Sequence, residues 1–312
     1  MTKEMQELAL ILAQCADMAR AAWTAQTLKA SQNLDTRPSE TMDFFSNLDE
    51  ELDTRLMEAL QSRLGVKHFL TEEGAKIPER NSIGGRRAII DSLDGSSNFI
   101  TYRPDFGISV SLEQDGFPLI GGIVTPVRGE LVIAGSGHGA YLFSCYGQEL
   151  RAVERMIISD IARSVNTATF ALKNVRKRKS PLETSRIYVH TGKRRNFELS
   201  PSSPWNTIYA KLANPACSFS CTVALLEVAM GKLDGAAIAF QNYWDFAAGR
   251  LIITEAGGHF AAFDRDFQHQ LGDKEFTLAH AGKNRTGDEW LCHIFAASSQ
   301  KLLEEMKNHF IS

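Results

Sequence analysis

The chain has 312 residues, which is enough for one large or two medium domains with a substantial core. Its composition, 44% apolar and 23% charged, is that of an ordinary globular protein, and its formal net charge of −3 gives no basic field that would attract a nucleic acid. No apolar run approaches the ~20 residues that span a bilayer, and residues 1–20 lack the basic and apolar regions of a signal peptide, so we expect a cytoplasmic protein without nucleic-acid or membrane partners.

Two helices are predicted in the N-terminal part of the chain. Apolar residues recur at helical spacing from Leu8 to Ala19 and again across residues 47–64. The intervening residues 31–46 are polar and include Pro38, which is typical of a loop or arm. This interpretation places Asp49 in the opening turn of the second helix.

The middle of the chain predicts antiparallel strands. Short runs rich in Val and Ile are separated there by Gly and Pro, which is typical of strands joined by tight turns. The glycine-rich residues 135–139 indicate a hairpin turn between two of these strands rather than a dinucleotide-binding loop. The predicted strands are residues 108–112, 119–124, 131–134 and 140–143.

The last third of the chain alternates helices and strands. A strand is predicted at residues 186–189. Helices are predicted at residues 221–230 and 244–256, each followed by a glycine that marks a helix end, and at 298–310. The change of texture favours a domain boundary between residues 150 and 165.

Asp91 and Asp94 form the most informative pair of acidic residues. They directly follow an apolar run at residues 88–90 and precede Gly95 and Ser96. Carboxylates at the end of a strand offer hard oxygen ligands to a divalent cation, while the backbone N–H groups and hydroxyls that follow suit an anion. The pattern indicates metal-assisted phosphate chemistry, although Asp-Gly is also a common turn dipeptide.

Three further acidic features have a structural alternative. Glu72 and Glu73 follow an apolar run, where solvated surface acids are common. Asp245 lies in the first turn of a predicted helix, where an acid favours the helix dipole or caps the helix. Asp49 is open to the same interpretation.

Taken together, these motifs resemble the inositol monophosphatase family of magnesium-dependent, lithium-sensitive phosphatases. The family signature D-P-[IL]-D-G-[ST]-x-N-F is matched from Asp91 to Phe99, apart from Ser92, where proline is usual. The chain also matches a second signature, W-D-x-A-A-G with a later E-A-G-G, and three shorter motifs. All of them occur in the same order as in the family. The matches cover residues 43–49 (loosely), 72–74, 91–99, 231–235, 244–249 and 255–258.

The resemblance implies a layered αβαβα sandwich, an α+β or α/β fold of the sugar-phosphatase type. Residues 1–155 would form a half with an antiparallel sheet and the metal motifs. Residues 156–312 would form an α/β half that contributes Asp245 and the substrate pocket. Because family members are often dimers, a homodimer is also expected.

The resemblance also implies two or three Mg²⁺ ions and inhibition by Li⁺. Glu72, Asp91 and the Leu93 carbonyl would hold the first ion. Asp91, Asp94 and Asp245 would hold the second, and Glu72 would help to hold a weaker third. Two such ions can stabilise both the entering and the leaving oxygen of a displacement at phosphorus.

The same resemblance assigns roles in hydrolysis by a metal-activated water. Ser96 would orient the water, with Glu72 and Asp49 accepting its proton. The N–H groups of Gly95 and Ser96 would hold oxygens of the phosphate group.

Two departures from the family pattern concern the substrate pocket. Inositol-specific members carry a glutamate seven residues before the W-D aspartate, where this chain has Ile238. Their Gly-[ST]-Ala turn corresponds to residues 219–221, so Phe219 replaces a permissive glycine and Ser220 follows it. A pocket that loses a polar partner discriminates differently among hydroxylated substrates.

The expected function is therefore Mg²⁺-dependent hydrolysis of a small phosphorylated metabolite, such as an inositol phosphate or a sugar phosphate. A 3'(2'),5'-bisphosphate nucleotidase or a histidinol-phosphate phosphatase is the alternative within the family, and Phe219 or Tyr243 could then contact a base. A third alternative is a catalytically weak binding or regulatory protein on the same scaffold.

Overall fold

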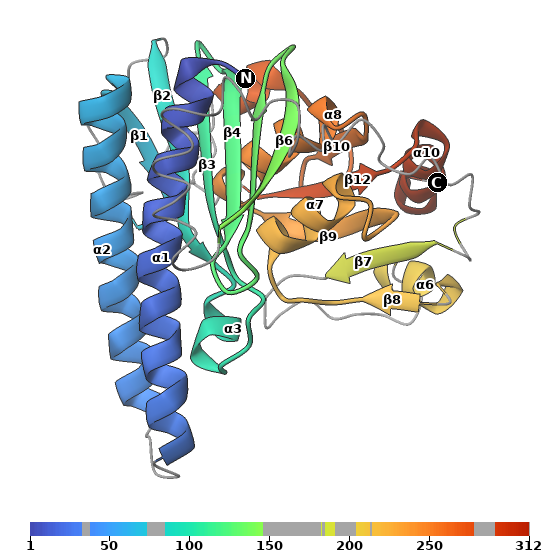
Figure 1. The fold of residues 1–312 in the computed structure, drawn as a ribbon. Coiled ribbons are helices and arrows are strands. Elements are labelled where there is room, and N and C mark those ends of the chain that lie inside the picture. The colour runs from blue at the N-terminus through green and yellow to red at the C-terminus, as the bar shows by residue number, and fades with distance from the viewer. Residues whose placement is uncertain are drawn as a thin grey trace.

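The structure is a computed structural model that describes eight stretches of the chain. Its elements stack in five layers that alternate helices and sheets, from the paired N-terminal helices at one side to α10 at the other (Figure 1). The described residues are 1–32, 38–73, 85–145, 182, 185–190, 204–212, 214–277 and 291–311.

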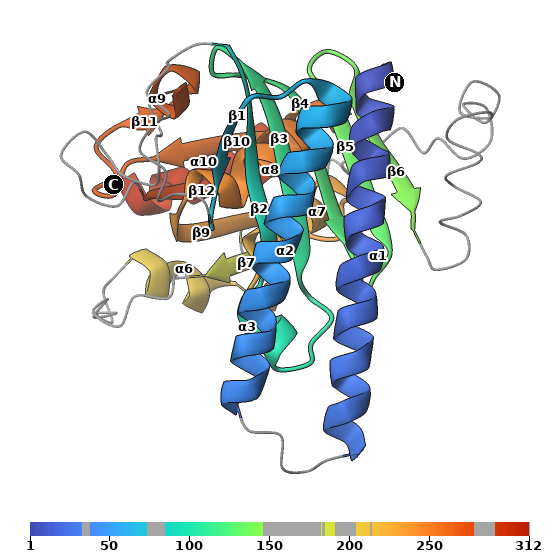
Figure 2. The same ribbon diagram turned by 90° about the vertical axis from the view of Figure 1, so that its left-hand side faces the viewer.

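The outermost layer consists of two long helices, α1 (Lys3–Gln32) and α2 (Pro38–Leu64), which lie side by side across one face of the first sheet (Figures 1 and 2). Their apolar stripes face this sheet, and Leu8, Leu12 and Leu56 are fully buried against it. The helical spacing of the leucines explains why each helix buries one side only.

The second helix begins earlier than the sequence predicted. Residues 38–46, expected as part of a loop, continue α2, so Asp49 lies inside the helix rather than in its first turn. The reason is that Pro38 occupies the first helical position, where its fixed φ and missing N–H are favourable.

The first sheet has six strands in the order β1-β2-β3-β4-β5-β6. Strands β2 to β6 pair antiparallel, as the sequence predicted, whereas β1 pairs with β2 in parallel. The predicted hairpin at residues 135–139 joins β5 to β6. The strands are β1 (His68–Thr71), β2 (Arg86–Asp94), β3 (Gly107–Gln114), β4 (Phe117–Thr125), β5 (Glu130–Gly135) and β6 (Gly139–Ser144).

The second sheet also has six strands, in the order β11-β10-β12-β9-β7-β8, and mixes parallel and antiparallel pairs. The predicted strand at 186–189 and the three predicted C-terminal helices are confirmed, with ends that differ by one or two residues. The strands are β7 (Arg186–His190), β8 (Asn214–Ala216), β9 (Gly235–Gln241), β10 (His259–Phe263), β11 (Gln270–Leu271) and β12 (Cys292–Ala297). The helices that the structure describes in this half are α6 (Pro204–Lys211), α7 (Cys221–Ala229), α8 (Tyr243–Glu255), α9 (Asp273–Thr277) and α10 (Gln300–Ile311).

Helices α7 and α8 form the central layer between the two sheets, and α6 and α10 cover the far face of the second sheet (Figure 1). Alternate strand residues therefore enter different cores. Ile89 and Ile294 pack around α7 and α8, whereas Ile90 packs under α1 and α2 and Phe295 packs under α10. This layering confirms the expected αβαβα sandwich.

The boundary expected between residues 150 and 165 lies outside the described residues, so the division at 155 stays a prediction. Among the helices that the structure describes, none combines the length and apolarity needed to cross a bilayer.

Candidate metal centre

Asp91 and Asp94 lie at the end of β2, where the strand carries a β-bulge. Asp91 is paired with Ser109 and Asp94 with Gly107, so β2 takes three steps where β3 takes two. Side chains three residues apart on a regular strand point to opposite faces, whereas the extra residue of a bulge returns them to one face. The bulge therefore explains how two aspartates at this spacing can serve one site.

Glu72 reaches the same edge of the sheet because β1 and β2 run parallel. Thr71 is paired with Ile90, and the N–H of Glu72 donates to the Ile90 carbonyl at 3.3 Å. The next residue on each strand, Glu72 and Asp91, consequently lie beside each other at the ends of the two strands.

Asp245 comes from the other half of the molecule, in the first turn of α8 and shortly after β9 ends. One of its carboxylate oxygens accepts the N–H of Asn242 at 2.7 Å, so the capping of α8 fixes its position. Carboxylate oxygens of Glu72, Asp91 and Asp245 lie within 4.8 Å of one another. The sequence predicted all three as ligands, and the fold brings them together.

The environment of Asp91 fits a divalent cation. The side chain is 1% exposed, and neither of its carboxylate oxygens has a hydrogen-bond partner within the described part of the chain. Burial, with the charges of Glu72, Asp94 and Asp245, raises its pKa well above the usual range. A buried carboxylate without a donor, beside three others, is stabilised by a cation with a preference for hard oxygen ligands, as Mg²⁺ has.

Asp94 is held from the opposite half of the molecule. Its Oδ2 accepts the Ser220 hydroxyl at 2.7 Å and the Thr222 N–H at 2.6 Å. These bonds orient the carboxylate at the start of α7. Asp94 is absent from the three-residue cluster just described, but its charge acts on Asp91.

Two residues predicted for the substrate pocket have other positions. Ser220 is 1% exposed, and its hydroxyl accepts the Val223 N–H at 3.1 Å, so it caps α7 and orients Asp94. Ile238 is fully buried in the core between the second sheet and α7 and α8. Because its side chain is buried there, the role of Ile238 in a substrate pocket stays a prediction. Phe219, the third, is 46% exposed.

Asp49 is buried in α2 and is held by Ser92. The Ser92 hydroxyl donates to Asp49 Oδ1 at 2.5 Å, and the two side chains are 2% and 5% exposed respectively. Burial raises the pKa of Asp49 to about 8, although the Ser92 hydrogen bond opposes this, and the charge of Glu72 adds to it. Proline at position 92 would provide no such donor, so this contact belongs to the departure from the family signature.

Replacing Ser92 by Ala is expected to lower the free energy of unfolding by about 1–3 kcal/mol, because a buried acceptor on Asp49 loses its donor. Ser62→Ala is the matched control, since the hydroxyl of that exposed serine bonds back to the Glu58 and Ala59 carbonyls of its own helix, and a change within about 0.5 kcal/mol is expected. Urea unfolding measures both. Equal effects of the two substitutions would contradict the role given to Ser92.

The stability of the metal-free protein is expected to fall as the pH rises from about 4 to about 8. The folded-state pKa of Asp49 is raised to about 8 and that of Asp91 is also raised, so folding favours their protonated forms, and this contribution is lost on ionisation. A bound cation favours the ionised forms instead. Thermal unfolding with and without Mg²⁺ should show a larger Mg²⁺-induced rise in Tm at pH 8 than at pH 6. An equal rise at both pH values would contradict the assignment.

The turn that follows Asp94 is held firmly in place. Gly95 has a φ of 92°, and its carbonyl accepts the N–H groups of Asn98 at 2.8 Å and Phe99 at 3.1 Å in the short helix α3 (Ser96–Ile100). The Asn98 amide donates to the carbonyls of Asp105 at 2.6 Å and Ser218 at 2.5 Å. Gly95 and Ser96 therefore sit in a braced turn, and their predicted contacts with phosphate stay a prediction.

The predicted ligand role of the Leu93 carbonyl also stays a prediction, since only its side chain is placed by contacts, in the core under α1 and α2. The contribution of Ser92 could be suspected only as a departure from the motif. The N–H of Thr222 had no signal in the sequence, because it lies 128 residues from Asp94 along the chain.

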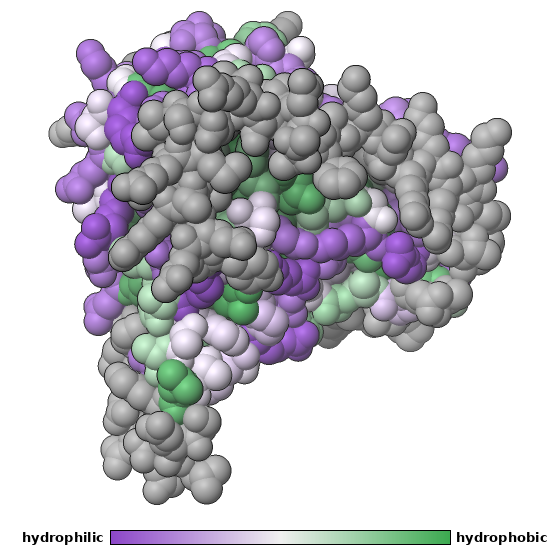
Figure 3. Space-filling model, in the orientation of Figure 1, coloured by the Kyte–Doolittle hydropathy of each residue, from purple (hydrophilic) through white to green (hydrophobic). Residues whose placement is uncertain are grey.

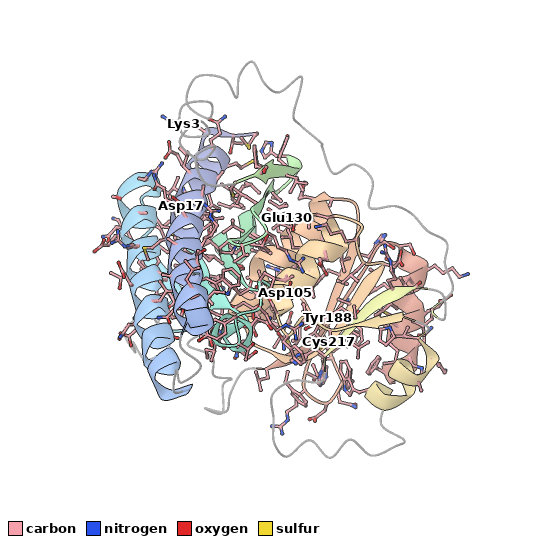
Figure 4. All side chains as sticks on the ribbon, turned by 60° about the horizontal axis from the view of Figure 1, so that its bottom comes forward. Lys3, Asp17, Asp105, Glu130, Tyr188 and Cys217 are labelled. Atoms are coloured by element: carbon pink, nitrogen blue, oxygen red, sulfur yellow. The ribbon has the colours of Figure 1, made fainter. Side chains whose placement is uncertain are left out.

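Ion pairs join the two halves next to this centre. Arg128, in the turn between β4 and β5, bonds to Asp105 and, at 2.5 Å, to Glu227 on α7. The face of the molecule that is turned to the viewer in Figure 1 carries hydrophilic side chains over its centre, at the level of α7 and β9 (Figures 1 and 3). Asn98 joins the two halves here by donating to the carbonyls of Asp105 and Ser218, and Figure 4 labels Asp105 together with Tyr188 and Cys217 of the second half. The centre is thus built at the junction of the two sheets.

Comparison with known proteins agrees with this architecture. Residues 3–300 match the model of the inositol monophosphatase family. The chain is 31% identical to an inositol-1-monophosphatase of Rhizobium meliloti over 73% of this chain and 75% of the relative, and 26% identical to a Pasteurella multocida protein named Nus factor SuhB over 77% and 79%. An inositol monophosphatase structure from Anabaena has the same fold, with a TM-score of 0.66 at 19% identity over 99% of this chain and 97% of that one. The chain therefore belongs to the inositol monophosphatase family.

Proposed function

We propose that this protein hydrolyses a small phosphate monoester with the help of Mg²⁺. The observation that carries the proposal is Asp91, a fully buried carboxylate whose two oxygens lack donors in the described structure, beside the carboxylates of Glu72 and Asp245. Membership of the inositol monophosphatase family supports it.

Glu72, Asp91 and the Leu93 carbonyl would hold the first cation. Asp91, Asp94 and Asp245 would hold the second, Asp94 through the oxygen not engaged by Ser220 and Thr222. Bound Mg²⁺ supplies Lewis-acid polarisation of the phosphate and lowers the pKa of water. Glu72, Asp91 and Asp94 come from the first half and Asp245 from the second, so the ligands are held by strands and a helix rather than by a single loop.

The chain's own groups would position the phosphate and receive the proton. The N–H groups of Gly95 and Ser96, in the turn between β2 and α3, would donate to phosphate oxygens. Asp49 and Glu72 would accept the proton, and burial raises the pKa of Asp49 to about 8 in the metal-free protein. Ser92 keeps the Asp49 carboxylate in place.

A panel of phosphate monoesters tests the proposal. Release of inorganic phosphate is measured with saturating Mg²⁺ from inositol, sugar, histidinol and 3′-nucleotide phosphates. Asp94→Asn should reduce turnover of every substrate about a hundredfold or more, because one metal ligand loses its charge while its bonds from Ser220 and Thr222 persist.

Asp234→Asn is the matched control for this substitution. Asp234 is 4% exposed, and its carboxylate accepts the Arg186 N–H at 2.8 Å. It lies just before the start of β9, whereas Asp245 follows the end of that strand. It should keep full turnover. Failure to hydrolyse any ester with Mg²⁺ present would reject the proposed activity.

A second candidate is a binding or regulatory role with weak catalysis, which the relatives named Nus factor SuhB bring into consideration. The same panel separates the two, since this role predicts Mg²⁺ binding without turnover. Inhibition by Li⁺, a homodimer and a cytoplasmic location stay predictions from the family resemblance.

A further inference from the structure

Phe219 is a large apolar side chain in an unusual backbone conformation beside the candidate metal centre. Its φ is 56°, in the left-handed region that costs a residue with a Cβ roughly 1–2 kcal/mol. Its ring is 46% exposed, so core burial does not compensate fully for that cost. Non-glycine residues held in this region cluster at functional sites.

Phe219 directly precedes a residue that belongs to the framework of the candidate metal centre. Ser220, the next residue, bonds to Asp94, and its Cβ lies 3.2 Å from the position that a Cβ on Gly95 would occupy. A phosphate held by the turn at Gly95 would therefore place its ester group near Phe219.

Two side chains from different halves hold the ring. The Arg103 guanidinium, from the loop after α3, lies 5.6 Å from the Phe219 ring centroid. The His190 ring, at the end of β7, meets it edge to face at a centroid distance of 6.1 Å. Cation–π and edge-to-face contacts orient an aromatic ring. Since Phe219 is 46% exposed, these contacts leave part of the ring open to solvent.

Tyr243, the other aromatic residue considered for a base, does not share this exposure. It is 1% exposed, bonds to Glu113, and stacks on Phe276 inside the protein. Phe219 is thus the one of the two that offers a π-face at the surface of the described structure.

We propose that Phe219, held by Arg103 and His190, forms a subsite for an aromatic ring carried by the alcohol part of the phosphate ester. The preferred substrates are then aromatic-ring esters rather than polyol phosphates. As a statement about substrates, this rests on the proposed phosphatase function; as a statement about binding, it does not.

Binding of two non-hydrolysable probes tests the subsite. Benzylphosphonate and cyclohexylmethylphosphonate have the same phosphonate and nearly the same bulk, and only the first has a π-system. Titration calorimetry with saturating Mg²⁺ should give about two- to tenfold tighter binding of benzylphosphonate. Equal affinities, or no binding of either probe, would overturn the proposal.

Three variants identify the ring responsible. Phe219→Gly relieves the backbone strain, so the fold is retained, and the ratio of the two affinities should fall to about one. Phe219→Tyr keeps a ring and should keep the ratio. Phe117→Ala removes another exposed phenylalanine, at the start of β4, and should leave the ratio unchanged. A ratio unaffected by Phe219→Gly would overturn the proposal.

Hydrolysis separates this inference from the proposed function. If benzyl phosphate and inositol phosphate are both stable to the protein with Mg²⁺, the phosphatase proposal fails, while the ratio of phosphonate affinities still decides the subsite. If both esters are hydrolysed and the phosphonates bind equally, only the subsite fails.

Discussion

Asp91→Asn is expected to lower Mg²⁺-dependent phosphate release by about a thousandfold or more and to stabilise the metal-free protein at pH 8. Activity falls because the shared ligand of both proposed ions loses its charge. Stability rises by on the order of 1–3 kcal/mol because a fully buried carboxylate, repelled by Glu72, Asp94 and Asp245, becomes a neutral amide. Initial rates and urea unfolding measure the two effects.

The opposite signs of these effects distinguish a metal site from a structural acid. Asp234→Asn, the control used for Asp94, removes a buried acid that already has a backbone donor, and should leave the rate unchanged without stabilising the protein. If Asp91→Asn instead destabilised the metal-free protein as a lost hydrogen bond would, Asp91 would be a structural residue.

Gly95→Ala is expected to destabilise the protein by about 2–5 kcal/mol and to reduce turnover by about a hundredfold. The new Cβ would lie 3.0 Å from the Asp105 carbonyl and 3.2 Å from Ser220 Cβ, at a φ of 92°. Both neighbours belong to the framework of the site, so relief of the clash moves the turn after Asp94. A displacement of about 1 Å at a catalytic site can cost a hundredfold in rate.

Gly137→Ala separates backbone strain from crowding. Gly137 has a similar positive φ of 72°, but a Cβ there would meet no atom within 4 Å. It should lose about 1–2 kcal/mol and no activity. Thermal unfolding and phosphate release of the two variants provide the comparison, and equal losses of stability would show that the space around Gly95 is not restrictive.

The acidic residues that the fold brings together could be predicted from the sequence because they belong to short motifs whose spacing the chemistry restricts. Asp91 and Asp94 are three residues apart, a spacing that places side chains on opposite faces of a regular strand, and the bulge between them resolves this. The motif predicted the positions of the two aspartates along the chain but not the β-bulge between them.

Residues that depend on packing between distant segments were harder to predict. Ile238 was assigned to the pocket by counting along the chain, whereas the fold buries its side chain completely in the core around α7 and α8. Ser220 looked like a substrate contact, yet its hydroxyl is used by Asp94 and Val223. Asp49 was predicted in the first turn of its helix because Pro38 was interpreted as a helix breaker. The helix instead begins at Pro38, so Asp49 lies in its interior.

The exposure of Phe219 also could not be read from the sequence. A phenylalanine in place of a glycine indicates added bulk, but its position relative to solvent depends on Arg103 and on His190, which lies outside every motif. Sequence patterns therefore predicted the cluster of acidic residues, and the fold was needed to find the exposed aromatic side chain of the proposed subsite.

The most direct test of the metal centre is anomalous scattering from crystals soaked in Mn²⁺, a divalent ion that also accepts carboxylate ligands. The account predicts an anomalous peak between the carboxylates of Glu72, Asp91 and Asp245, and its loss in Asp91→Asn crystals. Well-ordered crystals with no peak at this position, and with the Asp91 oxygens bonded to protein donors instead, would contradict it.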